Sequence, residues 1–296
     1  MNCYCRDIWR KLFWDSRWNI GYREKKGLFV NTEGNYTVFP FESKNIWYAD
    51  PFLAEDHSKN YIFCEAYLNN KEKGCIAVWE IGDQNPPSII IENDYHMSFP
   101  CVFQINNNWY MIPETSENKS LELYQAIQFP YKWRKSKILL EGKKLVDSVL
   151  YEEDKQYFIL SYDPILFELL IFSFEIDKLS ITQIYSHKYQ DNAGRPAGKL
   201  FRWNMDIIRP SQDCRTCYGK NIIFYKLDPL SSGRFDEVYI KDFDRESINV
   251  DGNRNIDRIH TYNSNQSYEV IDYAVSYFDL FKRLKILRRN LKRKNR

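Results

Sequence analysis

The chain has 296 residues, of which 44% are hydrophobic, 17% aromatic and 28% charged, and its formal net charge is +2. With 11 glycines and 11 prolines it is neither collagen-like nor of low complexity, and it has no apolar run of about 18 residues that would span a membrane as a helix. The near-neutral charge excludes a generally basic nucleic-acid-binding protein.

The N-terminal segment, residues 1–9, lacks the apolar core of a signal peptide. We therefore expect the protein in the cytoplasm, where most of its seven cysteines would be reduced core residues. Cys214 and Cys217 form a CxxC pair, but no second pair or nearby HxxxH completes a zinc site. We expect no metal and no cofactor, although a metal held by carboxylates elsewhere stays an open alternative.

From residue 49 onward the chain repeats with a period of about 48 residues. Equivalent positions are 50, 47 and 50 residues apart, at Asp50, Pro100, Asp147 and Ala197. The first apolar strand of each repeat is expected at 49–53, 99–103, 146–150 and 196–200, and the second at 61–67, 109–115, 157–163 and 207–213. Third strands are expected at 75–81, 121–126, 169–174 and 221–226, and fourth strands at 88–92, 136–140, 181–185 and 237–241. Repeats of this length built from short strands predict a β-propeller.

The fifth repeat is incomplete, because strands are expected only at 260–262 and 268–273. A ring has to close without leaving an open strand edge. We expect residues 18–22 or 27–30 to supply a missing strand, so that both chain ends close the last blade. The prediction is an all-β fold: a five-bladed propeller over residues 1–273.

The C-terminal segment, residues 274–296, has the pattern of a basic amphipathic helix. Between residues 282 and 296 there are nine basic and no acidic residues, which leaves 33 basic and 40 acidic residues in the rest. Apolar residues recur at helical spacing, at Tyr277, Phe281, Leu284, Leu287 and Leu291. We expect residues 277–296 to bind an anionic membrane surface, which would make the protein peripheral at the inner face of the membrane. A solvated tail that binds nothing is the alternative.

Polar residues converge on one face of the predicted propeller. In each blade the start of the first strand and the end of the antiparallel second strand meet there, forming a funnel around the central channel. The residues placed at this mouth are Asp50 and Glu65 from blade one, His96, Ser98 and Glu114 from blade two, Asp147 and Asp163 from blade three, Arg195, Arg209 and Asp213 from blade four, and His260 and Asp272 from blade five.

The same residues are also compatible with structural roles. Asp50 precedes a proline and could be a turn residue, and the two histidines could be satisfied by neighbours. Arginines at 195 and 209 could pair with nearby acids, but a guanidinium fork also suits a phosphate or carboxylate ligand.

Several strings of the sequence together resemble one family. They are residues 47–52, Glu65, and residues 96–100, 109–115, 121–124, 146–147, 194–198, 209–213 and 260–262. These motifs, spread over about residues 18–273, resemble the N-terminal domain of plant glucosamine inositolphosphorylceramide transferases and of bacterial proteins with this domain alone. In the plant family a separate C-terminal glycosyltransferase domain follows. The resemblance therefore implies glycan or glycolipid assembly without assigning catalysis to the propeller.

A more distant resemblance is to five-bladed glycoside hydrolases of the family 43 kind, which use three carboxylates from different blades. It implies that Asp50 corresponds to the first-blade base and Asp147 to a third-blade orienting acid. In blade four such a hydrolase presents a glutamic acid, where this chain has Arg195 and Pro196. Hydrolysis would lack the blade-four proton donor, although Asp213 or Glu114 could replace it. A diphosphate leaving group is instead stabilised by cations.

Three functions remain open from the sequence. The first is a sugar transferase in surface polysaccharide or glycolipid assembly, acting on a sugar nucleotide or glycan. In it Asp50 is a base or charge stabiliser, Glu114 or Asp147 is a partner carboxylate, and Arg195 with Arg209 forms a phosphate clamp. The second is a glycoside hydrolase, and the third a non-catalytic glycan-binding scaffold. The substrate-binding candidates are Glu65, His96, Arg195, Arg209, Asp213 and His260.

Overall fold

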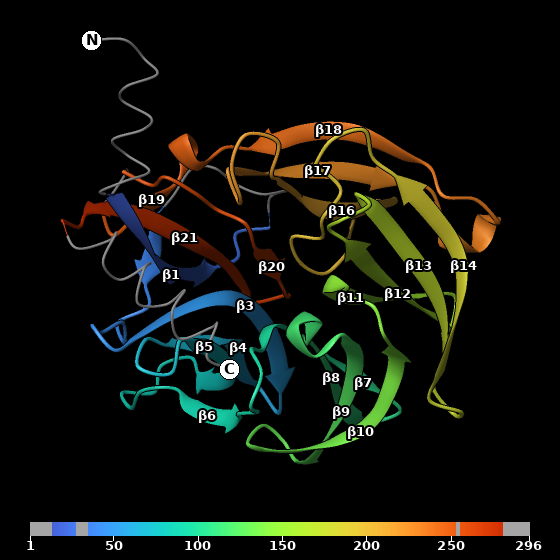
Figure 1. Ribbon diagram of the computed structural model, residues 1–296, viewed down its shortest axis with the longest axis horizontal. Helices are drawn as coiled ribbons and strands as arrows, with labels where there is room; N and C mark the ends of the chain where they lie inside the picture. The colour runs from blue at the N-terminus through green and yellow to red at the C-terminus, as the bar shows by residue number, and fades with distance from the viewer. Residues whose placement is uncertain (1–13, 28–34, 253–254, 281–296) are drawn as a thin grey trace.

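The computed structural model describes residues 14–27, 35–252 and 255–280. Its strands form five sheets arranged around a central axis, as Figure 1 shows. The predicted five-bladed, all-β propeller is therefore confirmed. Within the described ranges no helix is long and apolar enough to cross a membrane.

Blades one to four follow one another along the chain, and the first strand of each lies nearest the axis (Figure 1). Blade one contains β3 (Ile46–Asp56), β4 (Lys59–Leu68), β5 (Lys73–Glu80) and β6 (Ser88–Ile91), and blade two contains β7 (Ser98–Ile105), β8 (Asn108–Glu114), β9 (Ser120–Gln128) and β10 (Lys132–Glu141). Blade three contains β11 (Val146–Glu153), β12 (Gln156–Asp163), β13 (Glu168–Glu175) and β14 (Ser180–Lys188), and blade four contains β15 (Phe201–Trp203), β16 (Asp206–Asp213), β17 (Asn221–Leu227) and β18 (Glu237–Phe243).

Both ends of the chain build blade five. The strands are β20 (Tyr262–Ser264), β21 (Tyr268–Phe278), β1 (Trp14–Glu24), β2 (Asn35–Val38) and the short parallel β19 (Asn249–Val250). β1 pairs with β21 along its whole length, from Trp14 opposite Phe278 to Glu24 opposite Tyr268. This confirms closure by an N-terminal strand at residues 18–22. Of the other candidate strand, Gly27 lies outside any strand and residues 28–30 are not among those described.

The inner strand of blade four begins later than expected. Pro196 makes only an isolated bridge to Ser211, and β15 starts at Phe201. Proline has no backbone N–H for a ladder, and the adjoining Gly198 has φ 143°, which places its backbone against the Tyr262 carbonyl. The expected strand at 196–200 is therefore wrong for most of its length.

The expected start of the C-terminal helix is also wrong. Residues 274–278 continue β21, because pairing with β1 extends the strand to Phe278. Residues 281–296, which carry the basic run, lie outside the described residues. The amphipathic helix there stays a prediction.

Apolar contacts between neighbouring sheets hold the blades together around the central axis. At the junction of blades one and two, the rings of Phe52 and Phe99 meet edge to face with centroids 4.8 Å apart, and both are fully buried. Burial of one such side chain contributes about 1.5–3 kcal/mol. Related clusters join blade four to blade five and blade five to blade one.

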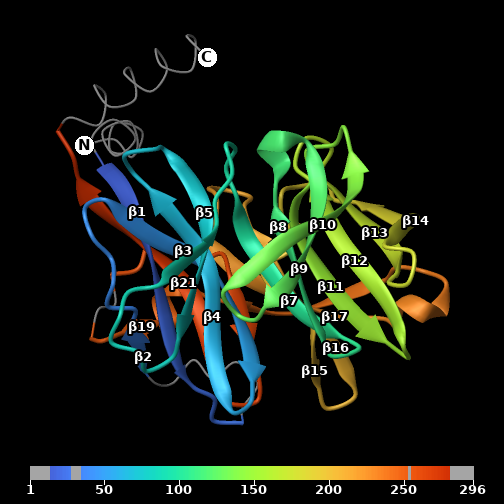
Figure 2. The ribbon, with the colours of Figure 1, turned by 90° about the horizontal axis from the view of Figure 1, so that it is seen from below.

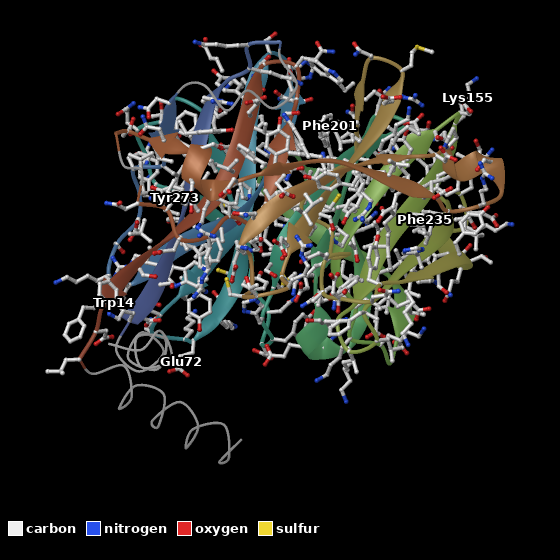
Figure 3. The ribbon with its side chains drawn as sticks, turned by 90° about the horizontal axis from the view of Figure 1, so that it is seen from above. Trp14, Glu72, Lys155, Phe201, Phe235 and Tyr273 are labelled. Carbon is white, nitrogen blue, oxygen red and sulfur yellow. The ribbon has the colours of Figure 1, made fainter. Side chains whose placement is uncertain are left out.

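The strands run between two faces of the ring, seen from the side in Figure 2. The face that bears the starts of β3, β7 and β11 is called the funnel face below. The turn at Glu72 and the beginning of β1 at Trp14 lie on it, whereas Lys155 and Phe201 lie on the opposite side (Figure 3).

Candidate functional site

Three inner strands share a backbone feature that builds the site. Asp50, Phe99 and Asp147 have left-handed φ values of 52°, 45° and 49°. At each of them the pairing with the next strand shifts register, as in a β-bulge. The equivalent of Asp50 in blade two is thus Phe99, one residue before the expected Pro100. Strained backbone of this kind costs about 1–3 kcal/mol per residue and is typical of functional sites.

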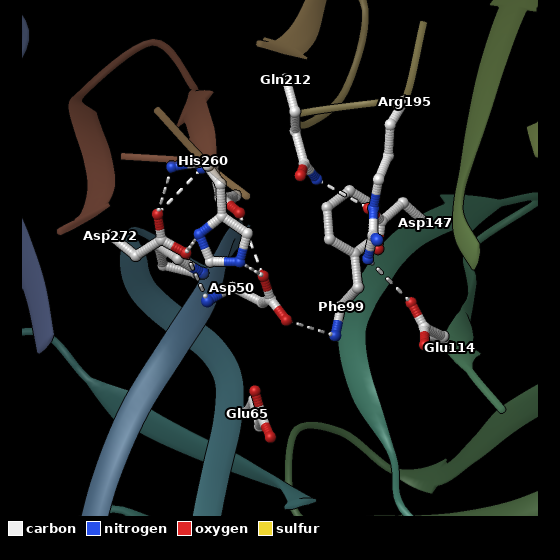
Figure 4. A network of polar contacts seen from close by, with 12 residues as sticks. Asp50, Glu65, Phe99, Glu114, Asp147, Arg195, Gln212, His260 and Asp272 are labelled. Atoms are coloured by element: carbon white, nitrogen blue, oxygen red, sulfur yellow. Dashed lines mark hydrogen bonds and ion pairs between the residues drawn. The ribbon is translucent and has the colours of Figure 1, made fainter. Parts of the chain in front are cut away.

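Asp50 is buried and held by three donors from other blades (Figure 4). Its Oδ1 accepts from Thr261 Oγ1 at 3.1 Å and lies 3.1 Å from Nε2 of His260. Its Oδ2 accepts from the backbone N–H of Phe99 at 3.2 Å. The carboxylate of Asp50 therefore ties together blades one, two and five.

His260 lies between two carboxylates. Its Nδ1 is 2.8 Å from Oδ2 of Asp272, an ion-pair contact without hydrogen-bond geometry. Burial lowers the pKa of His260, but the charges of Asp272 and Asp50 outweigh it and leave that pKa well above its usual value. Burial raises the pKa of Asp50, but His260 and Thr261 together bring it below its usual range.

These three residues could also hold a metal. One ligand atom from each of Asp50, His260 and Asp272 lies within 4.8 Å of the others. A protonated imidazole cannot ligate a cation, so a metal here would have to displace a proton from His260. The two carboxylates that raise the pKa of His260 would also attract a metal cation, so a proton and a metal would compete for this site.

A second polar group joins blades two, three and four. Arg195 donates through Nε to Oδ2 of Asp147, and its terminal nitrogen lies 3.5 Å from Oε2 of Glu114. Asp147 also accepts from Nε2 of Gln212 at 2.7 Å. Burial raises the pKa of Asp147 against the attraction of Arg195. The charge of Arg195 is thus shared between two carboxylates, as Figure 4 shows.

Glu65 lies beside Asp50, but its environment shifts its pKa in the opposite direction. It is opposite Ala49 in the β3–β4 pairing and is 5% exposed. Its Oε1 lies 3.4 Å from Nε2 of His96 and makes no hydrogen bond to any described residue. Burial, followed by the negative charge of Asp50, raises the pKa of Glu65 well above its usual value.

The backbone orients His96 toward Glu65. The N–H of Gly74 donates to Nδ1 of His96 at 2.9 Å, so Nε2 carries the ring proton that faces Glu65. Burial lowers the pKa of His96, which favours this neutral form. A side chain at Gly74 would collide with the Glu65 carboxyl and the His96 ring, so the close approach needs glycine.

Arg209 and Asp213, both expected at the funnel, lie outside this network, as does Asp163, whose Oδ1 accepts from backbone N–H groups of the turn that follows it. Arg209 is fully buried and donates to Glu237 through Nε at 2.8 Å, to Tyr189, and to the Gly194 carbonyl. The expected phosphate clamp of Arg195 and Arg209 is therefore not formed, because Glu237 holds the second guanidinium. Asp213, at the end of β16, pairs with its neighbour Arg215 at 2.9 Å.

The structure adds Gln212 and Thr261, which the motif strings contained without indicating a role, and Tyr218, which lies outside those strings. Gln212 reaches Asp147, and Thr261 reaches Asp50. Tyr218 lies over Arg195, with 5.1 Å between guanidinium carbon and ring centroid, and 5.0 Å from the His260 ring. The sequence offered no signal for these contacts, because Gln212 and Thr261 are buried among other buried residues and each reaches a carboxylate of another blade.

A solved structure with a similar fold is the GH43 α-L-arabinofuranosidase from Clostridium thermocellum. It has a TM-score of 0.55 and 12% identity, covering 78% of this chain and 83% of that chain. At this identity the likeness concerns the fold alone.

Two curated relatives are both named glucosamine inositolphosphorylceramide transferase 1. The protein from Oryza sativa subsp. indica is 30% identical over 228 residues, covering 70% of this chain and 29% of the relative. The protein from Arabidopsis thaliana is 29% identical over 242 residues, covering 74% and 31%. The chain thus spans less than a third of the length of these relatives. The family model described as glucosamine inositolphosphorylceramide transferase 1, N-terminal, matches residues 38–272. The resemblance noted in the motifs is therefore confirmed, and the chain belongs to this family of N-terminal domains.

Proposed function

We propose that the funnel catalyses transfer of a sugar unit in glycolipid or surface-glycan assembly. The observation that carries the proposal is the pair Asp50 and Glu65, whose environments shift their pKa values in opposite directions. Two neighbouring carboxyls tuned apart in this way can act as a charged group and a proton donor in one reaction. The relatives' names, which describe a sugar-transferring enzyme, support the same class of chemistry.

In the proposed reaction Glu65 begins protonated and gives its proton to the leaving oxygen of the donor. The bond between that oxygen and the anomeric carbon breaks, and the Asp50 carboxylate stabilises the positive charge that develops there. An acceptor hydroxyl then attacks the anomeric carbon and gives its proton to the Glu65 carboxylate. The sugar is thereby transferred from the donor to the acceptor, and Glu65 is protonated again.

Glu114 and Arg195 would bind the sugar. Oε2 of Glu114 is buried and makes no hydrogen bond to the described residues, apart from its 3.5 Å contact with Arg195. A buried acceptor without a hydrogen bond costs about 1–3 kcal/mol, which a ligand hydroxyl would recover. Because two carboxylates already compensate Arg195, a glycoside or lipid-linked donor suits this site better than a free diphosphate would.

The test is transfer by purified protein from a panel of sugar nucleotides, aryl glycosides and lipid-linked sugars. We expect Glu65→Gln to lower turnover at least about 100-fold, within the usual contribution of general acid catalysis. Asp50→Asn should lower it comparably, and surface Glu246→Gln serves as the matched control. Unchanged turnover in Glu65→Gln, with the fold retained, would remove Glu65 from the mechanism.

Hydrolysis is the second candidate, and the raised pKa of Glu65 favours it because this group can supply the acid that blade four lacks. Water would then take the place of the acceptor hydroxyl. Release of free sugar that is not suppressed by adding acceptor would identify a hydrolase. If neither product forms while glycans bind, the propeller is a binding module.

We further propose that the protein acts at the cytoplasmic face of a membrane. The nine basic residues between 282 and 296 support this, since each contributes about 1 kcal/mol near an anionic surface. The rest of the chain, with 40 acidic and 33 basic residues, would be repelled by such a surface. A membrane position would bring lipid-linked acceptors to the funnel.

A further inference from the structure

The turn between β12 and β13 exposes three large apolar side chains in a row. Asp163 and Glu168 are paired, so the turn consists of residues 164–167, Pro-Ile-Leu-Phe. The exposed fractions are 75% for Ile165, 50% for Leu166 and 37% for Phe167. Residues 164–167 are called the apolar hairpin below.

The polar turns of this propeller follow ordinary turn chemistry. The turn between β7 and β8 has Asn106 and Asn107 with φ of 49° and 63°, residues that adopt this conformation readily. In the apolar hairpin the left-handed position is Phe167, with φ 56°. This conformation is uncommon for a bulky residue, and Leu179 in the turn between β13 and β14 shares it, with φ 47°.

The apolar hairpin is rigid. Oδ1 of Asp163 accepts from the N–H of Ile165 at 2.9 Å and of Leu166 at 3.1 Å. The carbonyl of Phe167 accepts from the N–H of Tyr189 at 2.8 Å. These hydrogen bonds hold the backbone so that the side chains project into water. Binding would therefore cost little conformational entropy.

The apolar hairpin lies on the funnel face. In blade three Tyr162 pairs with Val146, next to Asp147, so the turn that follows β12 is beside the mouth. Blade five ends on the same face, where Tyr277 lines a pocket of about 220 Å³ with Trp47 and Tyr67. Leu280, 61% exposed, precedes the basic run of residues 282–296.

An anionic lipid surface fits this combination better than a protein does. Exposed apolar side chains in a chain that also carries a basic segment are features of interfacial membrane binding. A stable protein interface buries about 800 Å² per partner, far more than a four-residue turn presents. A bilayer has no such requirement, because a few side chains can insert among the headgroups.

We infer that the apolar hairpin inserts into an anionic leaflet and turns the funnel mouth toward the membrane. The inference rests on the proposed membrane location, and adds to it an orientation and a second contact that does not depend on the basic run. With blades three and five both in contact, the rim of the site would face the lipid headgroups.

Co-sedimentation with vesicles tests the inference without any assay of catalysis. The vesicles contain phosphatidylcholine alone or with phosphatidylglycerol. The proteins are the full chain, the double variant Ile165→Ser and Leu166→Ser, and a chain ending at Leu280. Met205→Ser is the matched control, because Met205 is 90% exposed in the turn between β15 and β16 on the opposite face.

We expect the double variant to bind anionic vesicles about tenfold more weakly than the full chain, and Met205→Ser to bind equally well. Ending the chain at Leu280 should also weaken binding and remove most of its salt dependence. If the double variant binds like the full chain, or if Met205→Ser weakens binding as much, the hairpin inference is overturned while the proposed location stands. If the full chain binds no vesicles, the location and the inference both fall, and the proposed transfer reaction does not.

Discussion

At Asp50 and Glu65, two chemically similar side chains acquire different properties from the number of donors around them. Asp50 has His260, Thr261 and the Phe99 N–H within hydrogen-bond or ion-pair distance, and these interactions stabilise its charged form. Glu65 is equally buried, but its Oε1 makes no hydrogen bond to a described residue, the Nε2 of His96 lying 3.4 Å away, and the charge of Asp50 is nearby. The acid–base division of the proposed mechanism follows from this difference.

The first prediction concerns Glu65 and pH. Folding raises the pKa of Glu65. At pH values above the ordinary pKa of glutamate, the folded protein therefore binds more protons than the unfolded chain. The contribution of Glu65 therefore makes the unfolding free energy fall as pH rises from about 4.3 toward the raised pKa, by up to about 1.4 kcal/mol per pH unit. Glu65→Gln removes this dependence.

Urea unfolding between about pH 5 and pH 8 checks the prediction. The stability of Glu65→Gln relative to the unmodified protein should increase with pH over this range. Glu246→Gln, 78% exposed at its side chain, controls for the removal of a carboxyl from the surface. A stability difference that does not change with pH would mean that Glu65 is ionised in the fold.

At the scale of single elements, the segment between β14 and β16 shows how blade four presents Arg195. Arg209 in β16 donates to Tyr189 and to the Gly194 carbonyl, and Glu237 in β18 accepts from both Arg209 and Tyr189. A side chain at Gly194 would collide with the Tyr189 ring. This group, in which Arg209 is fully buried, holds the chain just before Arg195, and we expect Arg209 to position Arg195.

The second prediction is that Arg209→Met lowers the unfolding free energy by about 3–5 kcal/mol, because Glu237 would be left as a buried charge without its partner. Arg234→Met should change it by about 0–1 kcal/mol, since Arg234 pairs with Asp228 on the surface and is 71% exposed. Chemical denaturation of both variants gives the comparison. Unaltered stability of Arg209→Met together with lost substrate binding would restore the substrate-clamp role expected from the sequence.

At the scale of the whole molecule, closure of the ring depends on residues from opposite ends of the chain. β1 and β21 are paired at 11 consecutive positions, from residues 14 and 278 to residues 24 and 268. The same blade supplies His260 and Asp272 to the site. Ring closure and the site are therefore coupled.

The third prediction follows from this closure. Deleting residues 1–24 removes β1 and leaves β21 with an open edge, so we expect loss of the cooperative thermal transition and aggregation. Deleting residues 1–13 keeps β1 and serves as the control. Circular dichroism melting of the two truncated proteins checks this, and a retained sharp transition without β1 would contradict it.

The sequence alone predicted the architecture, the four-stranded repeat, the closing strand at residues 18–22 and the family. These features depend on local alternation of apolar residues, repeated about every 48 positions, and on motif strings that stay contiguous in the chain. It also predicted that Asp50, Glu65 and Asp147 gather at one mouth, because strand direction and the two-residue period determine which end and face a residue occupies.

Only the tertiary structure decided what each of these side chains contacts. Arg209 and Arg195 both belong to blade four. Arg209 pairs with Glu237 of the same blade, whereas Arg195 pairs with carboxylates of blades two and three. Residues 274–278 have a helical pattern, but pairing with β1 makes them a strand. The lowered pKa of Asp50 depends on His260 and Thr261 of blade five, whereas burial raises the pKa of Glu65. Such contacts join residues up to 222 positions apart, as from Asp50 to Asp272, and no local pattern encodes them.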